Sequence, residues 1–157
     1  QLISTRHLYQ GYNLIFGQWQ QLLCFDSVNQ QLTPLNDGYH SICNGALNDI
    51  WPKMANGKHK LETYIQKKAM TKSPLCHRSL LTIMKNEQVS PDHSLPKTGL
   101  PLEWERRLSA IFIKSPEYGT RSTCIISVDN KNRVNVTETG YDNEGEAINQ
   151  QDFLLTL

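Results

Sequence analysis

Short apolar runs separated by turn residues dominate the first part of the chain. Residues 12–17 and 20–26 are rich in aromatic and aliphatic side chains, a composition typical of strands. The Gly-Gln-Trp step between the two runs predicts a hairpin turn. Residues 32–35 and 39–43 are two shorter strand candidates, and the Asn-Asp-Gly sequence at residues 36–38 predicts the turn between them.

A helical spacing replaces this pattern after residue 47. Asn48 and Asp49 are candidate N-cap residues, and Pro52 suits the first turn of a helix. A second helix is predicted to begin at Ser73–Pro74 and to present an apolar face as far as Met84. The apolar positions that place the first helix on one face are Met54, Leu61, Tyr64, Ile65 and Ala69.

The pattern returns to strands after a long loop. Residues 86–101 contain three prolines and one glycine, which predicts an unusually long irregular connection. A helical turn is predicted at residues 103–108. Strands on both sides of a helical pair favour an α+β fold with antiparallel sheets and packed helices over a repeating βαβ unit. The later strands are predicted at residues 109–114, 122–128, 133–139 and 152–157, with turns at residues 129–132 and 141–145.

Composition narrows the class of protein. The 157 residues suit one domain, and 16 Lys and Arg against 15 Asp and Glu give a formal net charge of +1. That balance argues against a general nucleic-acid surface, which needs clustered positive charge. No apolar run approaches the ~18 residues of a membrane span. No export signal is found at the start of the chain, so we expect a reducing, cytoplasmic setting.

The cysteines and histidines are dispersed along the chain. No two cysteines form a CxxC pair and no histidine supplies zinc-finger spacing, so the sequence predicts no metal site. Cys24 and Cys124 fall in apolar runs, and both are predicted to be buried strand residues. The dispersed histidines are expected to lie on the surface, or in the core with their ring nitrogens hydrogen-bonded. The remaining residues of these two types are Cys43, Cys76, His7, His40, His59, His77 and His93.

Two polar residues at the ends of predicted strands are candidate site residues. Asn44 precedes Gly45, and a side-chain amide there can donate to a developing oxyanion. Alternatively, Asn44 serves only turn chemistry, since Asn tolerates left-handed backbone. Arg121 precedes an apolar strand, where its planar guanidinium can stabilise negative charge. Its alternative role is a charge that discourages aggregation through a sheet edge.

Several segments together resemble one protein family. The most specific is Tyr-Gly-Thr-Arg at residues 118–121, which precedes the apolar strand and its Ser-Val-Asp ending. The order and spacing of all the segments resemble the C-terminal part of the NRDE family, over nearly the whole chain from about Tyr9 to Leu157. The other segments are Tyr9–Ile15, Leu32–Pro34, Cys43–Leu47 and Trp51–Pro52.

This resemblance implies a fold and an activity. NRDE proteins are similar to N-terminal-nucleophile hydrolases, so the chain is expected to form part of an αββα sandwich. The family's candidate nucleophile is a Cys that follows the initiator Met, whose own amine activates the thiol for cleavage of C–N amide bonds. The chain begins with Gln1 and holds neither that Cys nor the Asn-Arg-Asp-Glu signature. We therefore expect residues 1–157 to form a single domain or the C-terminal portion of a larger NRDE-type domain, inactive as a cysteine amidohydrolase without the N-terminal half.

The resemblance also suggests roles and partners. It gives Asn44 oxyanion donation and Arg121 charge stabilisation. Eukaryotic relatives suggest an alternative, non-enzymatic role in haem or lipid trafficking; a haem site needs an axial ligand and an apolar slot, and His40, Cys43 and Tyr118 are candidates. The expected partners are the N-terminal half of the same polypeptide, an unidentified small molecule and, through an exposed apolar sheet surface, a second copy of the chain.

Overall fold

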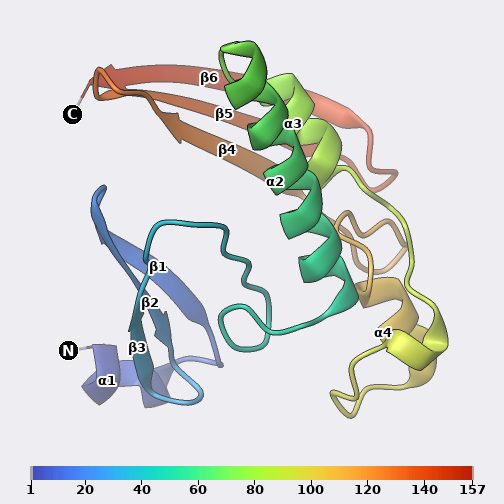
Figure 1. The fold of residues 1–157 in the computed structure, drawn as a ribbon. Helices are drawn as coiled ribbons and strands as arrows, with labels where there is room; N and C mark the ends of the chain where they lie inside the picture. The colour runs from blue at the N-terminus through green and yellow to red at the C-terminus, as the bar shows by residue number, and fades with distance from the viewer. Residues whose placement is uncertain (1, 157) are drawn as a thin grey trace.

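Two small antiparallel sheets and a helical pair form the framework of the computed structural model, which describes residues 2–156. One sheet has the strand order β1-β2-β3 and the other β4-β5-β6. Figure 1 shows α2 and α3 side by side against the second sheet, with the first sheet set apart from them. The predicted α+β class with antiparallel sheets is confirmed. The strands are β1 (Asn13–Gln18), β2 (Gln21–Asp26), β3 (Gln31–Pro34), β4 (Ser122–Val128), β5 (Arg133–Tyr141) and β6 (Ala147–Thr156). The helices are α1 (Leu2–Thr5), α2 (Pro52–Thr71), α3 (His77–Met84) and α4 (Leu102–Leu108), with short 3-10 turns at Arg6–Leu8 and Asp92–Ser94.

The first sheet contains the predicted hairpin. The turn itself lies at Trp19–Gln20, later than the predicted Gly-Gln-Trp step, and Gly17 is the last residue but one of β1. Gly17 has a φ of 133°, and a side chain there would collide with the carbonyl oxygen of Gln21, so the hairpin requires glycine at this position. The strand predicted at residues 39–43 does not form. Its backbone is held instead by a loop, in which the Ser41 N–H donates to Asn48 Oδ1 at 3.0 Å and the Asn48 N–H donates to the Ser41 carbonyl at 2.8 Å.

Helix α2 begins at Pro52, as its sequence predicts, but its N-cap residue is Trp51. Asp49 instead accepts a hydrogen bond from the Ala46 N–H at 2.7 Å and so stabilises the preceding loop. Lys72 ends the helix in left-handed backbone with a φ of 49°. Gly57 allows α2 to pack closely, because a Cβ there would lie 3.2 Å from Ile111 Cδ1.

Helix α3 begins at His77 rather than at the predicted Ser73–Pro74. The Tyr64 hydroxyl on α2 accepts a hydrogen bond from the Cys76 N–H at 2.7 Å and holds the connection extended up to that residue. The hydrogen bond between Tyr64 on α2 and Cys76 therefore keeps residues 72–76 outside both helices as a linker.

The second sheet is built on β5, which pairs with β4 and β6. Strand β6 begins at Ala147, ahead of the predicted start at Asp152, and the predicted end of that strand at Leu157 lies outside the described residues. The strand predicted at residues 109–114 does not form. The Phe112 N–H donates to the Asn86 carbonyl and the Ile113 N–H to Thr120 Oγ1, so these groups are bonded to loops and not to a sheet.

One face of the second sheet is apolar and open to solvent. Ile126, Phe153 and Leu155 share this face in the strand register, and their exposed fractions are 63%, 49% and 56%. Cys124 lies on the same face and is exposed, so the prediction that it is buried is wrong, whereas Cys24 is buried as predicted. The expected exposed apolar face is therefore present, and β1 and β4 are both edge strands.

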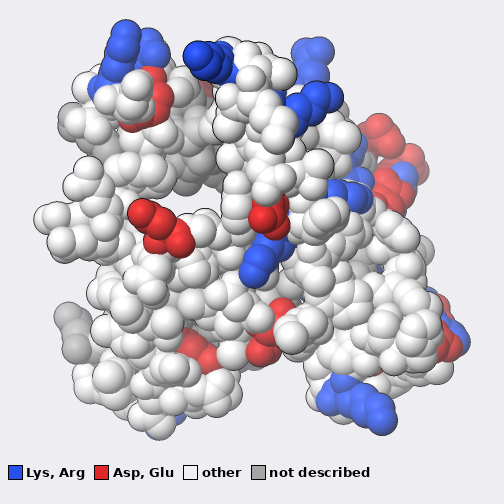
Figure 2. All heavy atoms as spheres, in the orientation of Figure 1, with Lys and Arg blue, Asp and Glu red and all other residues white. Residues whose placement is uncertain are grey.

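Charged side chains of both signs lie on the surface. Figure 2 shows Lys and Arg interspersed with Asp and Glu on the visible face, together with an open hollow between the part that carries β4–β6 and the part that carries β1–β3. Among the described helices, none combines the length and the apolar character required to cross a bilayer.

Phe112 anchors the loop that precedes β4. Its side chain is 1% exposed, and its ring meets the Tyr141 ring edge-on at a centroid distance of 4.9 Å. We expect Phe112→Ala to lower the free energy of unfolding by about 3–5 kcal/mol, because it leaves a cavity in the core. Phe153→Ala, on the open sheet face, serves as the matched control and should change it by about 0.5 kcal/mol or less. Urea denaturation measures both, and equal losses would contradict this account.

Candidate functional site

The largest of the cavities described among residues 2–156 lies between α2, α3 and β4. It has a volume of about 530 Å³, within the range of small-molecule sites, and we call it the α2–α3–β4 groove. Helical spacing explains its walls, because residues three, four or seven positions apart share one helix face. The apolar residues that form most of the wall are Met54, Leu61, Leu80, Ile83, Met84 and Ile126.

Two of the three haem-ligand candidates lie at this groove. Cys43 and His40 both line it, whereas Tyr118 packs against Trp104 outside it. The Cys43 thiol donates to the Met54 sulfur at 3.1 Å, so two soft sulfur atoms meet in the wall. The structure therefore brings a thiol and a thioether together where sequence spacing alone selected neither.

Both ring nitrogens of His40 are hydrogen-bonded within its own loop. Its Nε2–H donates to the Asn36 carbonyl at 2.8 Å, and its Nδ1 accepts from Asn48 Nδ2 at 3.0 Å. A neutral imidazole has one donor and one acceptor, so both are used. His40 braces the loop between β3 and α2 and leaves no lone pair for a metal.

The loop that carries Cys43 is tied to the first sheet. Asn13 on β1 donates from Nδ2 to the carbonyl oxygens of Cys43 and Gly45, at 2.7 and 2.9 Å. Gly45 is required by close packing, since a Cβ there would clash with the Asp49 carboxylate and lie 3.1 Å from the Trp51 ring. The Asn-Gly step therefore reflects close packing of the loop.

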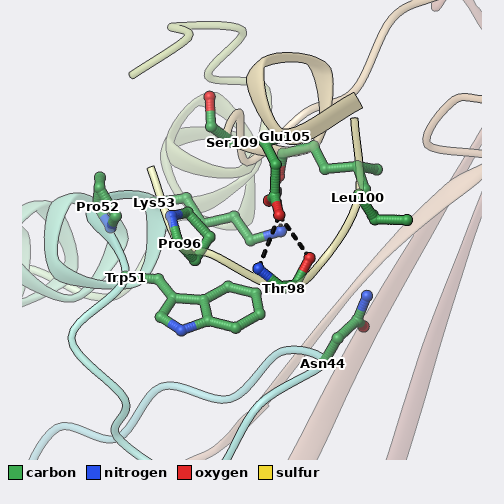
Figure 3. A pocket seen from close by; sticks show the side chains of 10 residues that line it. Asn44, Trp51, Pro52, Lys53, Pro96, Thr98, Leu100, Glu105 and Ser109 are labelled. Carbon is green, nitrogen blue, oxygen red and sulfur yellow. Dashed lines mark hydrogen bonds between the residues drawn. The ribbon is translucent and has the colours of Figure 1, made fainter. Parts of the chain in front are cut away.

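Asn44 lies at the edge of a second cavity of about 330 Å³ (Figure 3). Trp51 and Lys53 from the start of α2 face Glu105 and Thr98 across it. The Lys53 ammonium donates to the Leu108 carbonyl at 2.9 Å. The exposed Asn44 side chain makes none of the described hydrogen bonds, so its amide is free to meet a ligand in this cavity.

Glu105 is the buried acid of this cavity, and sequence reasoning did not select it. Its side chain is 6% exposed, and Oε1 accepts the Thr98 hydroxyl at 2.6 Å and the Thr98 N–H at 2.8 Å. The hydrogen bond from the Thr98 hydroxyl is the main reason that the pKa of this carboxyl lies below its ordinary value. The bonds fasten the long loop of residues 86–101 to α4.

Arg121 lies elsewhere. Its carbonyl accepts the Tyr141 N–H at 2.8 Å, and its exposed guanidinium donates from Nη1 to Asn143 Oδ1 in the turn between β5 and β6. Arg121 lines neither of the two described cavities that Asn44 lines. The two predicted site residues therefore do not share a cavity in this structure.

The Glu105 contacts predict a specific pH dependence. Because the folded-state pKa is lowered, the carboxylate stabilises the fold above the ordinary glutamate pKa of about 4.3, and this contribution is lost as the pH falls through the lower folded-state pKa. Glu105→Gln should therefore reduce thermal stability at pH 7 and reduce the loss of stability on acidification. Melting temperatures of both chains between pH 7 and pH 3 test this. Parallel curves would contradict it.

Comparison with known proteins matches a family to nearly the whole chain. A profile of the family described as "Transport and Golgi organisation 2" matches residues 1–143, which include the segments that carried the NRDE resemblance. The chain is 30% identical over 142 residues to the human "Transport and Golgi organization protein 2 homolog", covering 84% of this chain and 51% of that protein. It is 29% identical over 147 residues to the Mus musculus homolog, covering 87% and 53%. The Bos taurus homolog is 27% identical over 143 residues, with coverages of 84% and 51%, so the chain spans about half the length of these relatives. The chain belongs to the transport and Golgi organisation 2 family.

Proposed function

We propose that the α2–α3–β4 groove binds a hydrophobic molecule and that haem is a cargo whose size and chemistry it suits. The observation that carries this proposal is the contact between the Cys43 thiol and the Met54 thioether in the wall of a largely apolar cavity of about 530 Å³. Soft sulfur donors in an apolar slot are among the arrangements that bind haem iron.

The other residues of the groove support the same cargo. Lys53 and Lys58 also line it; the Lys53 ammonium is bonded to the Leu108 carbonyl, whereas the Lys58 ammonium makes no described hydrogen bond and would be available to a haem propionate. His40 supplies no iron ligand in this proposal, because both of its ring nitrogens are hydrogen-bonded. Cys43 is the proposed axial ligand, and Met54 is its sulfur neighbour.

Haem titration distinguishes Cys43, the proposed iron ligand, from His40, which does not bind the iron in this proposal. We expect a saturable Soret band with the unaltered chain and a displaced or weakened band with Cys43→Ala, because the thiolate ligand is lost. His40→Ala should keep the spectrum of the bound haem, since His40 does not reach the iron. Cys76→Ala is the matched control, because Cys76 is also a free thiol but does not line the groove. A Cys43→Ala spectrum identical to that of the unaltered chain would refute iron ligation by Cys43.

A second candidate function is the amidohydrolase activity that the NRDE resemblance implies. Three observations favour a larger domain: the apolar face of the second sheet is open, β1 and β4 are edge strands, and the relatives are about twice as long. In this proposal the N-terminal part covers that face, completes the αββα sandwich and brings a nucleophilic Cys. The free amide of Asn44 then serves as oxyanion donor. Arg121 lines neither described cavity of Asn44, so it would stabilise charge only once the N-terminal part closes a site over both residues.

Reconstitution tests the completed domain. The chain is co-expressed with the part of the human relative that lies outside the matching region. We expect a one-to-one complex, and self-association of the chain when it is purified alone, because the open face is apolar. Phe153→Asp should prevent both by placing a charge on that face. Light scattering that shows a monodisperse monomer, with no complex, would contradict this proposal.

The same complex reports on amide cleavage. With an N-acyl p-nitroanilide as probe, we expect Asn44→Ala to reduce turnover by about 10²–10³-fold, as loss of an oxyanion donor does. Arg121→Ala should abolish turnover. Asn130→Ala and Arg78→Ala are matched controls at exposed positions and should leave it unchanged. Unchanged turnover in Asn44→Ala and Arg121→Ala would remove both residues from the mechanism.

A further inference from the structure

His77 contacts two hydroxyl groups where α3 meets the second sheet, and one of them is bonded in turn to a carboxylate. Its Nε2 lies 2.8 Å from Ser127 Oγ on β4, and its Nδ1 lies 2.7 Å from Thr137 Oγ1 on β5. The Thr137 hydroxyl in turn donates to Asp152 Oδ1 on β6 at 2.6 Å. One continuous chain of hydrogen bonds therefore runs across all three strands from Ser127 to Asp152.

Hydrogen-bond accounting fixes the direction of this chain. The Asp152 carboxylate only accepts, so the single hydroxyl proton of Thr137 points to Asp152. Thr137 Oγ1 then accepts from His77, which places the imidazole proton on Nδ1. In the neutral imidazole the other ring nitrogen, Nε2, then has a lone pair that accepts the Ser127 hydroxyl proton. This is the orientation in which an imidazole acts as general base toward a serine.

Asp152 is held in the charged form that this direction requires. The hydrogen bond from the Thr137 hydroxyl is the main reason that the pKa of the Asp152 carboxyl is lowered, and a second bond from Gln150 Nε2 at 2.9 Å lowers it further. Thr137 is buried and Asp152 is exposed. Because the Thr137 hydroxyl lies between the Asp152 carboxylate and the His77 imidazole, it transmits the orienting effect of the carboxylate to the imidazole.

We propose that Ser127 is a nucleophile for acyl transfer, with His77 as its general base, and that the substrates are esters with a small apolar acyl group. A cavity of about 370 Å³ lies directly over the cluster. Leu75 and Leu154 supply an apolar wall for the acyl group. Asn135 faces Ser127 in the β4–β5 register, lines the same cavity and makes no described side-chain hydrogen bond, so its amide can donate to the oxyanion.

The proposed reaction balances with water as the only co-reactant. Ser127 Oγ attacks the ester carbonyl carbon while its proton passes to His77 Nε2. The tetrahedral intermediate expels the alcohol, which takes that proton, and leaves an acyl group on Ser127. Water then attacks the acyl carbon with His77 as base, the carboxylic acid is released, and the Ser127 hydroxyl is restored. Thr137 and Asp152 are positioning residues that fix the imidazole.

This site is separate from the proposed haem groove. The two cavities share no lining residue, because one opens over Ser127 and His77 and the other lies between α2, α3 and β4. Failure of one proposal therefore leaves the other standing, and each has its own assay.

A fluorophosphonate probe tests the nucleophile directly. Attack by Ser127 Oγ forms a P–O bond and expels fluoride while His77 takes the proton, so intact mass spectrometry shows a single adduct that peptide mapping places on Ser127. Ser127→Ala should abolish labelling. Ser122→Ala is the matched control on the same strand and should leave it unchanged. His77→Gln should slow labelling by about 10²-fold or more, the usual contribution of a general base.

Variants of Thr137 distinguish a reactive cluster from a purely structural contact. Thr137→Val keeps the shape but removes the hydroxyl, and it should slow both labelling and hydrolysis of p-nitrophenyl butyrate. Thr137→Ser restores the hydroxyl and should rescue both rates. Melting curves verify that each variant is folded. Labelling of Ser127 no faster than that of Ser122, or rates that are equal in the Val and Ser variants, would overturn the proposal.

Discussion

The one-sided packing of α2 and α3 on the β4–β5–β6 sheet is the constraint on which the rest of the structure depends. The apolar face of this sheet requires a partner, and the described residues supply a helical layer only for the opposite face. The covered face buries Thr123, Thr137, Thr139 and Tyr141, whereas the opposite face leaves Ile126, Phe153 and Leu155 open. The groove is lined by α2, α3 and the edge strand β4, and His77 meets the sheet where α3 begins.

The sequence predicted elements well where local spacing determines them. The apolar face of α2, the hairpin at Gly17 and the strands at 122–128 and 133–139 follow from periodicity and turn chemistry. Residues 39–43 and 109–114 have strand-like composition but form no strands. Their backbone groups find partners in loops and side chains, such as the Asn86 carbonyl that binds the Phe112 N–H, and no local pattern encodes those partners.

The candidate sites depended on contacts that sequence spacing does not reveal. Asn44 lies at the edge of a cavity, and its proposed role as an oxyanion donor stays a prediction; Glu105, which lines the same cavity, lies on a separate helix that no local pattern connects to Asn44. The sequence offers His40 as a haem ligand, but both of its ring nitrogens are hydrogen-bonded within the loop. The partners of His77 lie 50 and 60 residues away, so a reading of the helix alone leaves it as one of several dispersed histidines.

The Asn13 amide has a mechanical consequence. It holds the carbonyl oxygens on both sides of Asn44, and its own Oδ1 is buried without a partner among the described residues, so its orientation is set by those two bonds alone. A displacement of β1 would carry Cys43 with it and change the distance between the two sulfur atoms. If the groove binds haem as proposed, its affinity and the placement of the N-terminal sheet are coupled through a single carboxamide.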